Sequence, residues 1–113
     1  MLSVKEYIRH ILDEAVYLNE QVQKISRHEF LLNETLKRAF VRSIEIIGEA
    51  AKNVPDEIRK KYPDIEWRAM AGMRDRLVHG YFGVDYDIVW NVVTHNIPVL
   101  RDKIEVMLKD ESF

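Results

Sequence analysis

Apolar residues recur at spacings of three and four along most of this chain, which is the pattern of helices that bury one face. The first apolar stripe runs from Val4 to Ile25, and Ser3 just before it has the side chain of a good N-cap. A second stripe runs from Leu36 to Val54. Between the two, residues 26–33 predict either a break or a short turn of helix. The pattern therefore predicts two long amphipathic helices in the first half of the chain.

Small residues interrupt the second stripe at Gly48, Ala50 and Ala51. Side chains of this size let the backbone of another helix approach closely. Apolar side chains such as Val41 and Ile46 point away from the main stripe. We therefore expect this helix to be buried on more than one side.

The second half of the chain predicts three further helices. A proline begins a short one, Pro55–Lys61, as a first-turn residue. The next helix is expected over about Ile65–His79, and residues 80–84, which include two glycines, are expected to form a turn. A last helix is expected over Asp85–Lys109, with Asp85 as its N-cap. Pro98 predicts a kink in that helix, because proline removes a backbone hydrogen-bond donor.

No segment shows the alternation of a β-strand, and we find no internal repeat or linker. A chain of 113 residues with 47% hydrophobic and 32% charged residues is typical of one folded domain. We therefore predict a single all-α domain over residues 1–113, an antiparallel bundle of four main helices plus one short helix.

The composition narrows the classes of function. The chain has no cysteine, so disulfides, thiolate metal sites and cysteine nucleophiles are excluded. Its N-terminal sequence lacks an apolar signal core, and no apolar run approaches the roughly 18 residues that a membrane span needs. We expect a cytoplasmic protein. A formal charge of -2 gives no global basic field for nucleic acid, so any RNA contact must come from local positive charge.

The densest candidate chemistry lies in residues 74–81, RDRLVHGY, at the end of an expected helix. A histidine at a helix C-terminus lies at the negative end of the helix dipole, which favours its protonated form. Asp75 precedes His79 by four residues, so on a helix the two share a face, and the carboxylate could orient the imidazole and raise its pKa. The simpler alternative is that the basic side chains only cap the helix.

Arg74 and His79 are five residues apart, which is about 140° around an ideal helix. They would converge only if the helix loosens at Gly80, if the long arginine wraps round, or if a second subunit completes the site. The spacing alone leaves these three arrangements open.

The pattern Arg-x4-His-x-Tyr, formed by Arg74, His79 and Tyr81, resembles the signature of the HepT-like branch of the HEPN superfamily. The resemblance extends through IIGEAAK at residues 46–52, IEWRAMAGMRDR at residues 65–76, and the helix that Asp85 opens. It covers nearly the whole chain.

The resemblance implies an RNA-cleaving toxin that needs no metal or other cofactor and forms a homodimer. Its catalytic pair would be Arg74 and His79, and Asp75 fits a polar supporting position. Its partner would be a small nucleotidyltransferase antitoxin of the MntA type, which adenylylates Tyr81. Two alternatives remain: a HEPN module that has lost catalysis and only binds a nucleotide or its partner, and a purely structural helical dimer.

Other polar residues support no second chemistry as clearly. His10, His28 and His95 are scattered and lack the spacing of metal ligands, so we predict no metal site. Trp67 and Trp90 are interpreted as core residues rather than as platforms for bases.

Arg42, Glu45 and Glu49 share one face of the second helix at spacings of three and four. The first interpretation is a solvated ion pair. The alternative is that Arg42 and Glu49 line the same cleft as the motif helix.

Overall fold

The two long stripes form the two longest helices, α1 (Val4–Lys24) and α3 (Glu34–Lys52), in a computed structural model that describes residues 2–79 and 83–110. The other described elements are the helices α2 (Arg27–Leu32), α4 (Asp56–Lys61), α5 (Trp67–Leu77), α6 (Tyr86–Asn91) and α7 (Ile97–Lys109), the π-helical turn η1 (Val92–Asn96), and the two-residue strands β1 (Val78–His79) and β2 (Gly83–Val84).

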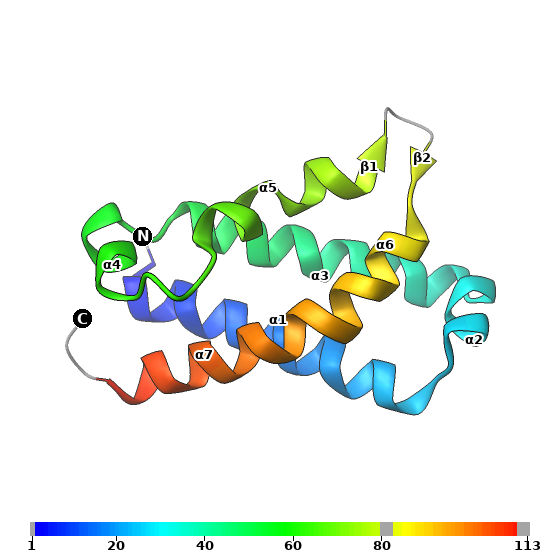
Figure 1. The fold of residues 1–113 in the computed structure, drawn as a ribbon, viewed down its shortest axis with the longest axis horizontal. Coiled ribbons are helices and arrows are strands. Elements are labelled where there is room, and N and C mark those ends of the chain that lie inside the picture. Colours follow the sequence, from blue (N-terminus) through cyan, green and yellow to red (C-terminus); the bar gives the residue numbers. More distant parts are fainter. Residues whose placement is uncertain (1, 80–82, 111–113) are drawn as a thin grey trace.

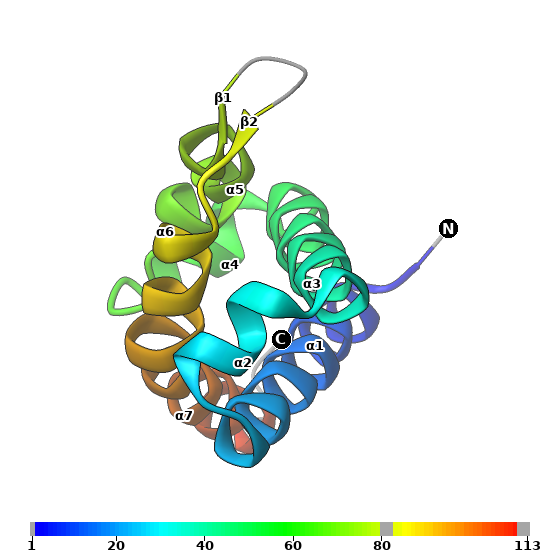
Figure 2. The same cartoon turned by 90° about the vertical axis from the view of Figure 1, so that its right-hand side faces the viewer.

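Successive long helices run in opposite directions along the molecule (Figure 1). They are α1, α3, α5 and the continuous α6–η1–α7 segment. Seen end-on in Figure 2, α1 lies beside α3 and α7, and α5 lies beside α3. The predicted all-α bundle of four main helices is confirmed.

The bundle carries two short helices in the described residues, not the one that we predicted. The second is α2, within residues 26–33, where a break was the alternative expectation. Ser26 explains it: its hydroxyl accepts a hydrogen bond from the Glu29 N–H at 3.1 Å, and its own N–H donates to the Glu29 carboxylate at 2.9 Å. The bond from the Ser26 N–H to the Glu29 carboxylate, followed by a contribution from the Ser26 side chain, holds the pKa of Glu29 below its ordinary value.

The apolar stripes meet in one core. Side chains with no or almost no exposed surface come from α1, α3, α5 and the last helical segment; they include Ile8, Ile11, Leu18, Phe40, Ile44, Ile47, Leu77, Ile97, Ile104 and Met107. Trp67 is buried and donates its indole N–H to the Tyr62 carbonyl at 3.1 Å. Trp90 is partly buried against Phe30, with ring centroids 5.3 Å apart. Both tryptophans therefore pack in or against the core, as interpreted from the sequence.

The motif helix is shorter than the predicted Ile65–His79. It spans Trp67–Leu77, and its last helical bond joins the Val78 N–H to the Arg74 carbonyl. Val78 then pairs with Val84, and His79 with Gly83, as an antiparallel ladder. The Asp85 N–H closes its base on the Leu77 carbonyl at 2.9 Å. Strands of two residues are too short to show alternation, so the sequence pattern does not indicate this ladder.

The last helix is not uniform either. Asp85 is its N-cap as predicted, accepting a hydrogen bond from the Ile88 N–H at 3.2 Å. The departure from α geometry is the π turn η1, which ends just before Pro98 in the first turn of α7. Pro98 has no N–H to donate to the carbonyl of residue 94, so one α-helical hydrogen bond is missing next to this turn. Among the described residues, no helix combines the length and apolarity needed to span a membrane.

Candidate functional site

A glycine sets how closely α5 lies on α3. A Cβ atom at Gly48 would lie 3.1 Å from the Met70 carbonyl oxygen and 3.6 Å from that of Ala71. The backbone of α5 therefore rests almost directly on α3, and any larger residue at position 48 would have to push it away. The prediction that small residues in this helix allow a close approach is confirmed at Gly48.

This crossing brings charged residues of the two helices together. Glu45 lies one turn before Gly48 on α3, and Arg74 lies one turn after Met70 on α5. The Arg74 Nε lies 3.5 Å from the Glu45 Oε2. The first residue of the predicted catalytic pair is thus held by a carboxylate from a different helix.

The same carboxylate oxygen also faces a second arginine. The Arg42 Nη1 lies 3.9 Å from Glu45 Oε2. The side chains of Arg42 and Arg74 are 69% and 56% exposed, and that of Glu45 is 31% exposed. Ion pairs this exposed contribute little to stability and open easily. Arg42 and Arg74, called here the arginine pair, therefore remain available to an anion from solution.

The interpretation of Arg42 as part of an ion pair is confirmed by this contact. Glu49 instead pairs with Lys52, 3.3 Å away on the same helix. Arg42 and Glu49 do line one hollow of about 170 Å³ between α1 and α3, but Arg74 is not among its lining residues. The alternative of one cleft shared with the motif helix is therefore not what the structure has: Arg42 lies between this hollow and Arg74.

His79 lies two residues beyond the end of α5, on the extended backbone of β1. The expectation that Asp75 and His79 share a helix face is therefore wrong, since the i, i+4 relation holds only within a helix. For the same reason, His79 is not in the last turn of the helix, where the dipole would favour its protonated form. Asp75 is exposed, and the side chain of His79 lies outside what the structure describes. The first of the three arrangements left open above is changed: the helix ends at Leu77, before Gly80, so the chain leaves helical geometry between Arg74 and His79.

Tyr81 lies outside the described residues. The pairing of His79 with Gly83 nevertheless brings together the two ends of the three-residue stretch that contains it. In the sequence, Tyr81 is two residues from each member of that pair.

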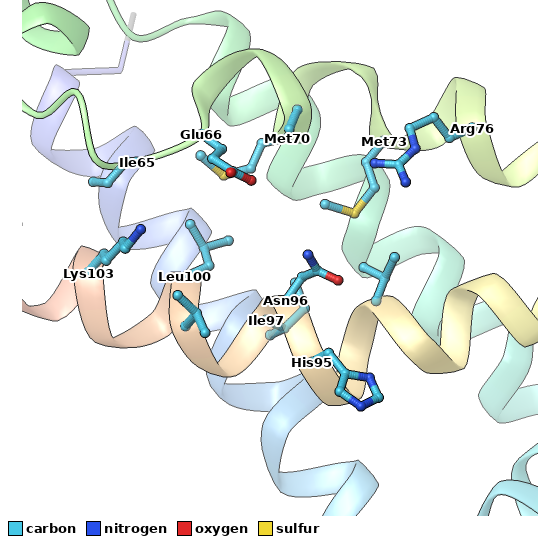
Figure 3. Close-up of a pocket in the computed structure, with 13 residues that line it drawn as sticks. Ile65, Glu66, Met70, Met73, Arg76, His95, Asn96, Ile97, Leu100 and Lys103 are labelled. Carbon is cyan, nitrogen blue, oxygen red and sulfur yellow. The ribbon is translucent and has the colours of Figure 1, made fainter.

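Sequence reasoning missed a second hollow, of about 210 Å³, between α5 and the η1–α7 segment. Figure 3 shows Glu66, Met73 and Asn96 pointing into the gap between the two ribbons. Its apolar side chains include Met70 and Leu100. The apolar stripes of the two helices suggest a closed core, so nothing in their spacing indicates that the bundle stays open here. This hollow, called the groove below, lies on the side of α5 that faces α7. Arg74 instead contacts Glu45 on α3.

A comparison with sequence families identifies the chain. The model of the family described as "Ribonuclease HepT-like" matches residues 5–107. The chain belongs to the HepT-like ribonuclease family. This match confirms the resemblance drawn from Arg74, His79 and Tyr81, and with it the ribonuclease class.

Individual HepT-like relatives agree along nearly their whole length. A protein of Caldanaerobacter subterraneus subsp. tengcongensis, named as a candidate RNase, is 46% identical over 112 residues, 99% of this chain and 100% of that protein. One from Thermococcus cleftensis, named "Probable ribonuclease HepT", is 40% identical over 107 residues, 95% of this chain and 97% of its own. One from Methanocaldococcus jannaschii, also named as a candidate RNase, is 40% identical over 108 residues, 96% of this chain and 89% of its own. No solved structure matches the chain significantly.

Proposed function

We propose that this HepT-like protein is a toxin that cleaves RNA internally without a metal, with Arg74 and His79 as its catalytic pair. The observation that carries the proposal is the position of Arg74. Its guanidinium is more than half exposed at the end of α5, and the backbone turns there directly into the strand that contains His79.

The chemistry needs little from the protein, because RNA supplies its own nucleophile. The 2′-oxygen attacks the adjacent phosphorus and loses its proton to a base, while the bond to the 5′-oxygen breaks and that oxygen takes up a proton. The products are a 2′,3′-cyclic phosphate and a 5′-hydroxyl. An imidazole with a pKa near neutrality suits both proton transfers. In a homodimer, one His79 would act as the base and the other as the acid.

Arg74 would bind the phosphate and the charge that grows on it. A guanidinium offers a planar fork of N–H donors that matches two phosphate oxygens. In the free protein, Glu45 occupies one side of this guanidinium. A contact at 3.5 Å on a half-exposed side chain is weak enough for a phosphate to replace it or to share the guanidinium.

The test is cleavage of single-stranded RNA or tRNA by the purified protein in EDTA, compared with Arg74→Ala and His79→Ala. Loss of a group that transfers a proton costs about 10²–10⁴-fold in rate, and we expect both variants to fall by at least the lower figure with their helical circular dichroism unchanged. Arg76→Ala is the matched control, since Arg76 is exposed on the same helix but lines the groove toward α7. If EDTA stops cleavage, or if both variants keep full activity, the assignment is wrong.

We further propose that the protein is a cytoplasmic homodimer, silenced by a nucleotidyltransferase antitoxin of the MntA type that adenylylates Tyr81. The resemblance to the HepT-like family is the basis for this partner. The pairing of His79 with Gly83, which flank Tyr81 in the sequence, supports Tyr81 as the residue that is modified. A phenol there can accept a nucleotidyl group, and each AMP added would place negative phosphate near the motif. Such a phosphate would compete with RNA for Arg74.

Incubation with the cognate nucleotidyltransferase, ATP and magnesium should therefore add AMP to Tyr81 and stop RNA cleavage. Tyr81→Phe should fold, cleave RNA and escape silencing. Tyr86→Phe is the control and should still be silenced, because its ring packs beside Phe30. Mass spectrometry that finds AMP on another residue, or on none, would refute the role of Tyr81 and leave the nuclease proposal standing.

A HEPN module that binds a nucleotide or its partner without cleaving RNA is the second candidate. The net charge of -2 favours it, because it gives RNA no long-range attraction. The cleavage assay above separates the two candidates.

A further inference from the structure

The arginine pair has a geometry that a single catalytic arginine does not need. Guanidiniums from two different helices both lie within 4 Å of one oxygen, Oε2 of Glu45, at 3.9 Å for Arg42 and 3.5 Å for Arg74. Two cations against one carboxylate leave a local positive charge on a chain whose net charge is negative. Two guanidiniums, each able to donate paired hydrogen bonds to an anion, therefore lie close together on the surface.

The hollow beside Arg42 has the chemistry of a site for a nucleoside. Tyr7 and His10 line it from α1, Arg42 and Ile46 line it from α3, and Asn53 lines it just after the end of α3. The rings of Tyr7 and His10 meet edge to face, with centroids 6.4 Å apart. Aromatic and imidazole rings offer faces on which unpaired bases stack, and polar side chains at the edge offer hydrogen bonds.

We propose that Arg42 binds the RNA phosphate next to the one held by Arg74, and that the hollow between α1 and α3 receives the nucleoside attached to it. The inference rests on the proposed function and extends it: the substrate would be a single-stranded RNA that crosses α3 from Arg74 to Tyr7 and His10. Single-stranded RNA fits better than an isolated anion, because a polyanion with regularly spaced phosphates can engage both arginines at once. In the free protein Glu45 faces both guanidiniums, and the RNA phosphates would replace it or share the guanidiniums with it.

Substrate length provides a specific test. A dinucleotide has only the scissile phosphate, whereas a longer oligoribonucleotide also has the flanking phosphate and base. Arg42→Ala should raise KM for the longer RNA about 10-fold or more, the cost of one hydrogen-bonded charge contact, with a smaller effect on the dinucleotide. The salt dependence of binding should lose about one phosphate contact. Arg42→Lys should recover part of the loss, because it keeps the charge without the fork.

His10→Ala tests the hollow separately, since it removes an exposed ring that lines the hollow and leaves both arginines in the sequence unchanged. It should weaken binding of the longer RNA and leave the dinucleotide less affected. Arg68→Ala is the control for lost charge, because Arg68 is exposed on α5 outside both hollows. It should behave as the unaltered protein.

The outcomes separate the two proposals. If the protein cleaves RNA and Arg74→Ala abolishes cleavage, but Arg42→Ala and His10→Ala match Arg68→Ala on the longer RNA, the flanking site is refuted and the proposed function stands. Binding of a 2′-O-methyl oligoribonucleotide, which cannot be cut, is measured in parallel by fluorescence anisotropy. Absence of such binding by the unaltered protein would refute the flanking site even if cleavage also fails. An effect of Arg42→Ala on silencing by the antitoxin but not on RNA would also overturn it.

Discussion

At the scale of single residues, the guanidinium of Arg74 pairs with Glu45 in the free protein, and under our proposal it would bind a phosphate in a complex with RNA. The contact with Glu45 keeps the side chain near one position without burying it. That arrangement limits the conformational freedom that Arg74 must lose on binding, at the cost of a weak competing ion pair.

The shape of the guanidinium, and not only its charge, should matter at this position. Arg74→Lys keeps the positive charge but replaces a bidentate fork by a point charge, and we expect RNA cleavage to fall by about 10-fold or more. The measurement is the single-turnover rate with saturating RNA. Arg76→Lys should have no effect, and an Arg74→Lys enzyme with the full rate would mean that Arg74 provides general electrostatic attraction only.

The sequence singled out Arg74, His79 and Tyr81 by their spacing, because a motif of this kind is local. It did not find Glu45 as the partner of Arg74. That contact joins residues 29 positions apart and depends on how closely two helices cross. The nearest local signal was the small residue at position 48, whose meaning becomes clear only when the crossing is known.

At the scale of elements, the crossing of α3 and α5 positions the arginine pair. A side chain at Gly48 would meet backbone atoms of α5, which cannot rotate away as a flexible side chain can. Gly72, on α5 itself, has no heavy atom within 4 Å of the position where a Cβ would lie. The two glycines therefore differ in what a larger residue would do.

Gly48→Val should destabilise the protein by about 1–3 kcal/mol, the usual cost of overpacking. It should also lower RNA cleavage by more than the unfolded fraction explains, because a displaced α5 would carry Arg74 away from its position beside α3. Gly72→Ala should instead stabilise the protein by up to about 1 kcal/mol, since alanine favours a helix over glycine. Chemical denaturation measures both. A Gly48→Val protein as stable as the parent would show that the crossing is not tight.

The ends of elements were the least predictable part of the fold. Apolar residues continue at helical spacing through Leu77 and Val78, so the periodicity predicted that the motif helix would extend to His79. The helix ends because the Asp85 N–H and the pairing of Val78 with Val84 offer its backbone other partners. The π turn η1 was missed for a related reason, since the apolar stripe is continuous across it and Pro98 indicated only that some irregularity was needed.

At the scale of the whole molecule, the all-α bundle followed directly from four apolar stripes, because each stripe must find another to be buried. The stripes do not show how completely the bundle closes. α5 and α7 leave a groove between them, and Val99 and Val106 on α7 are exposed.

The proposed homodimer can be tested by mass in solution. A stable association of this kind buries on the order of 1,200 Å² or more, so the dimer should persist at micromolar concentration. Sedimentation or light scattering should give twice the mass of the chain. A monomer under these conditions would remove the mechanism in which two His79 residues divide the roles of base and acid.

The central claim is that the protein cleaves RNA by using the 2′-hydroxyl of the RNA as the nucleophile, with no metal ion. The most direct measurement compares a single-stranded RNA with the same oligonucleotide carrying 2′-deoxyribose at the cleaved position, both in EDTA. We expect the RNA to be cut into fragments ending in a 2′,3′-cyclic phosphate and a 5′-hydroxyl, the deoxy-substituted strand to stay intact at that position, and Arg74→Ala to cut neither. Cleavage of the deoxy-substituted strand at that position, products with a 5′-phosphate, or cleavage only when a divalent metal is restored would contradict the account.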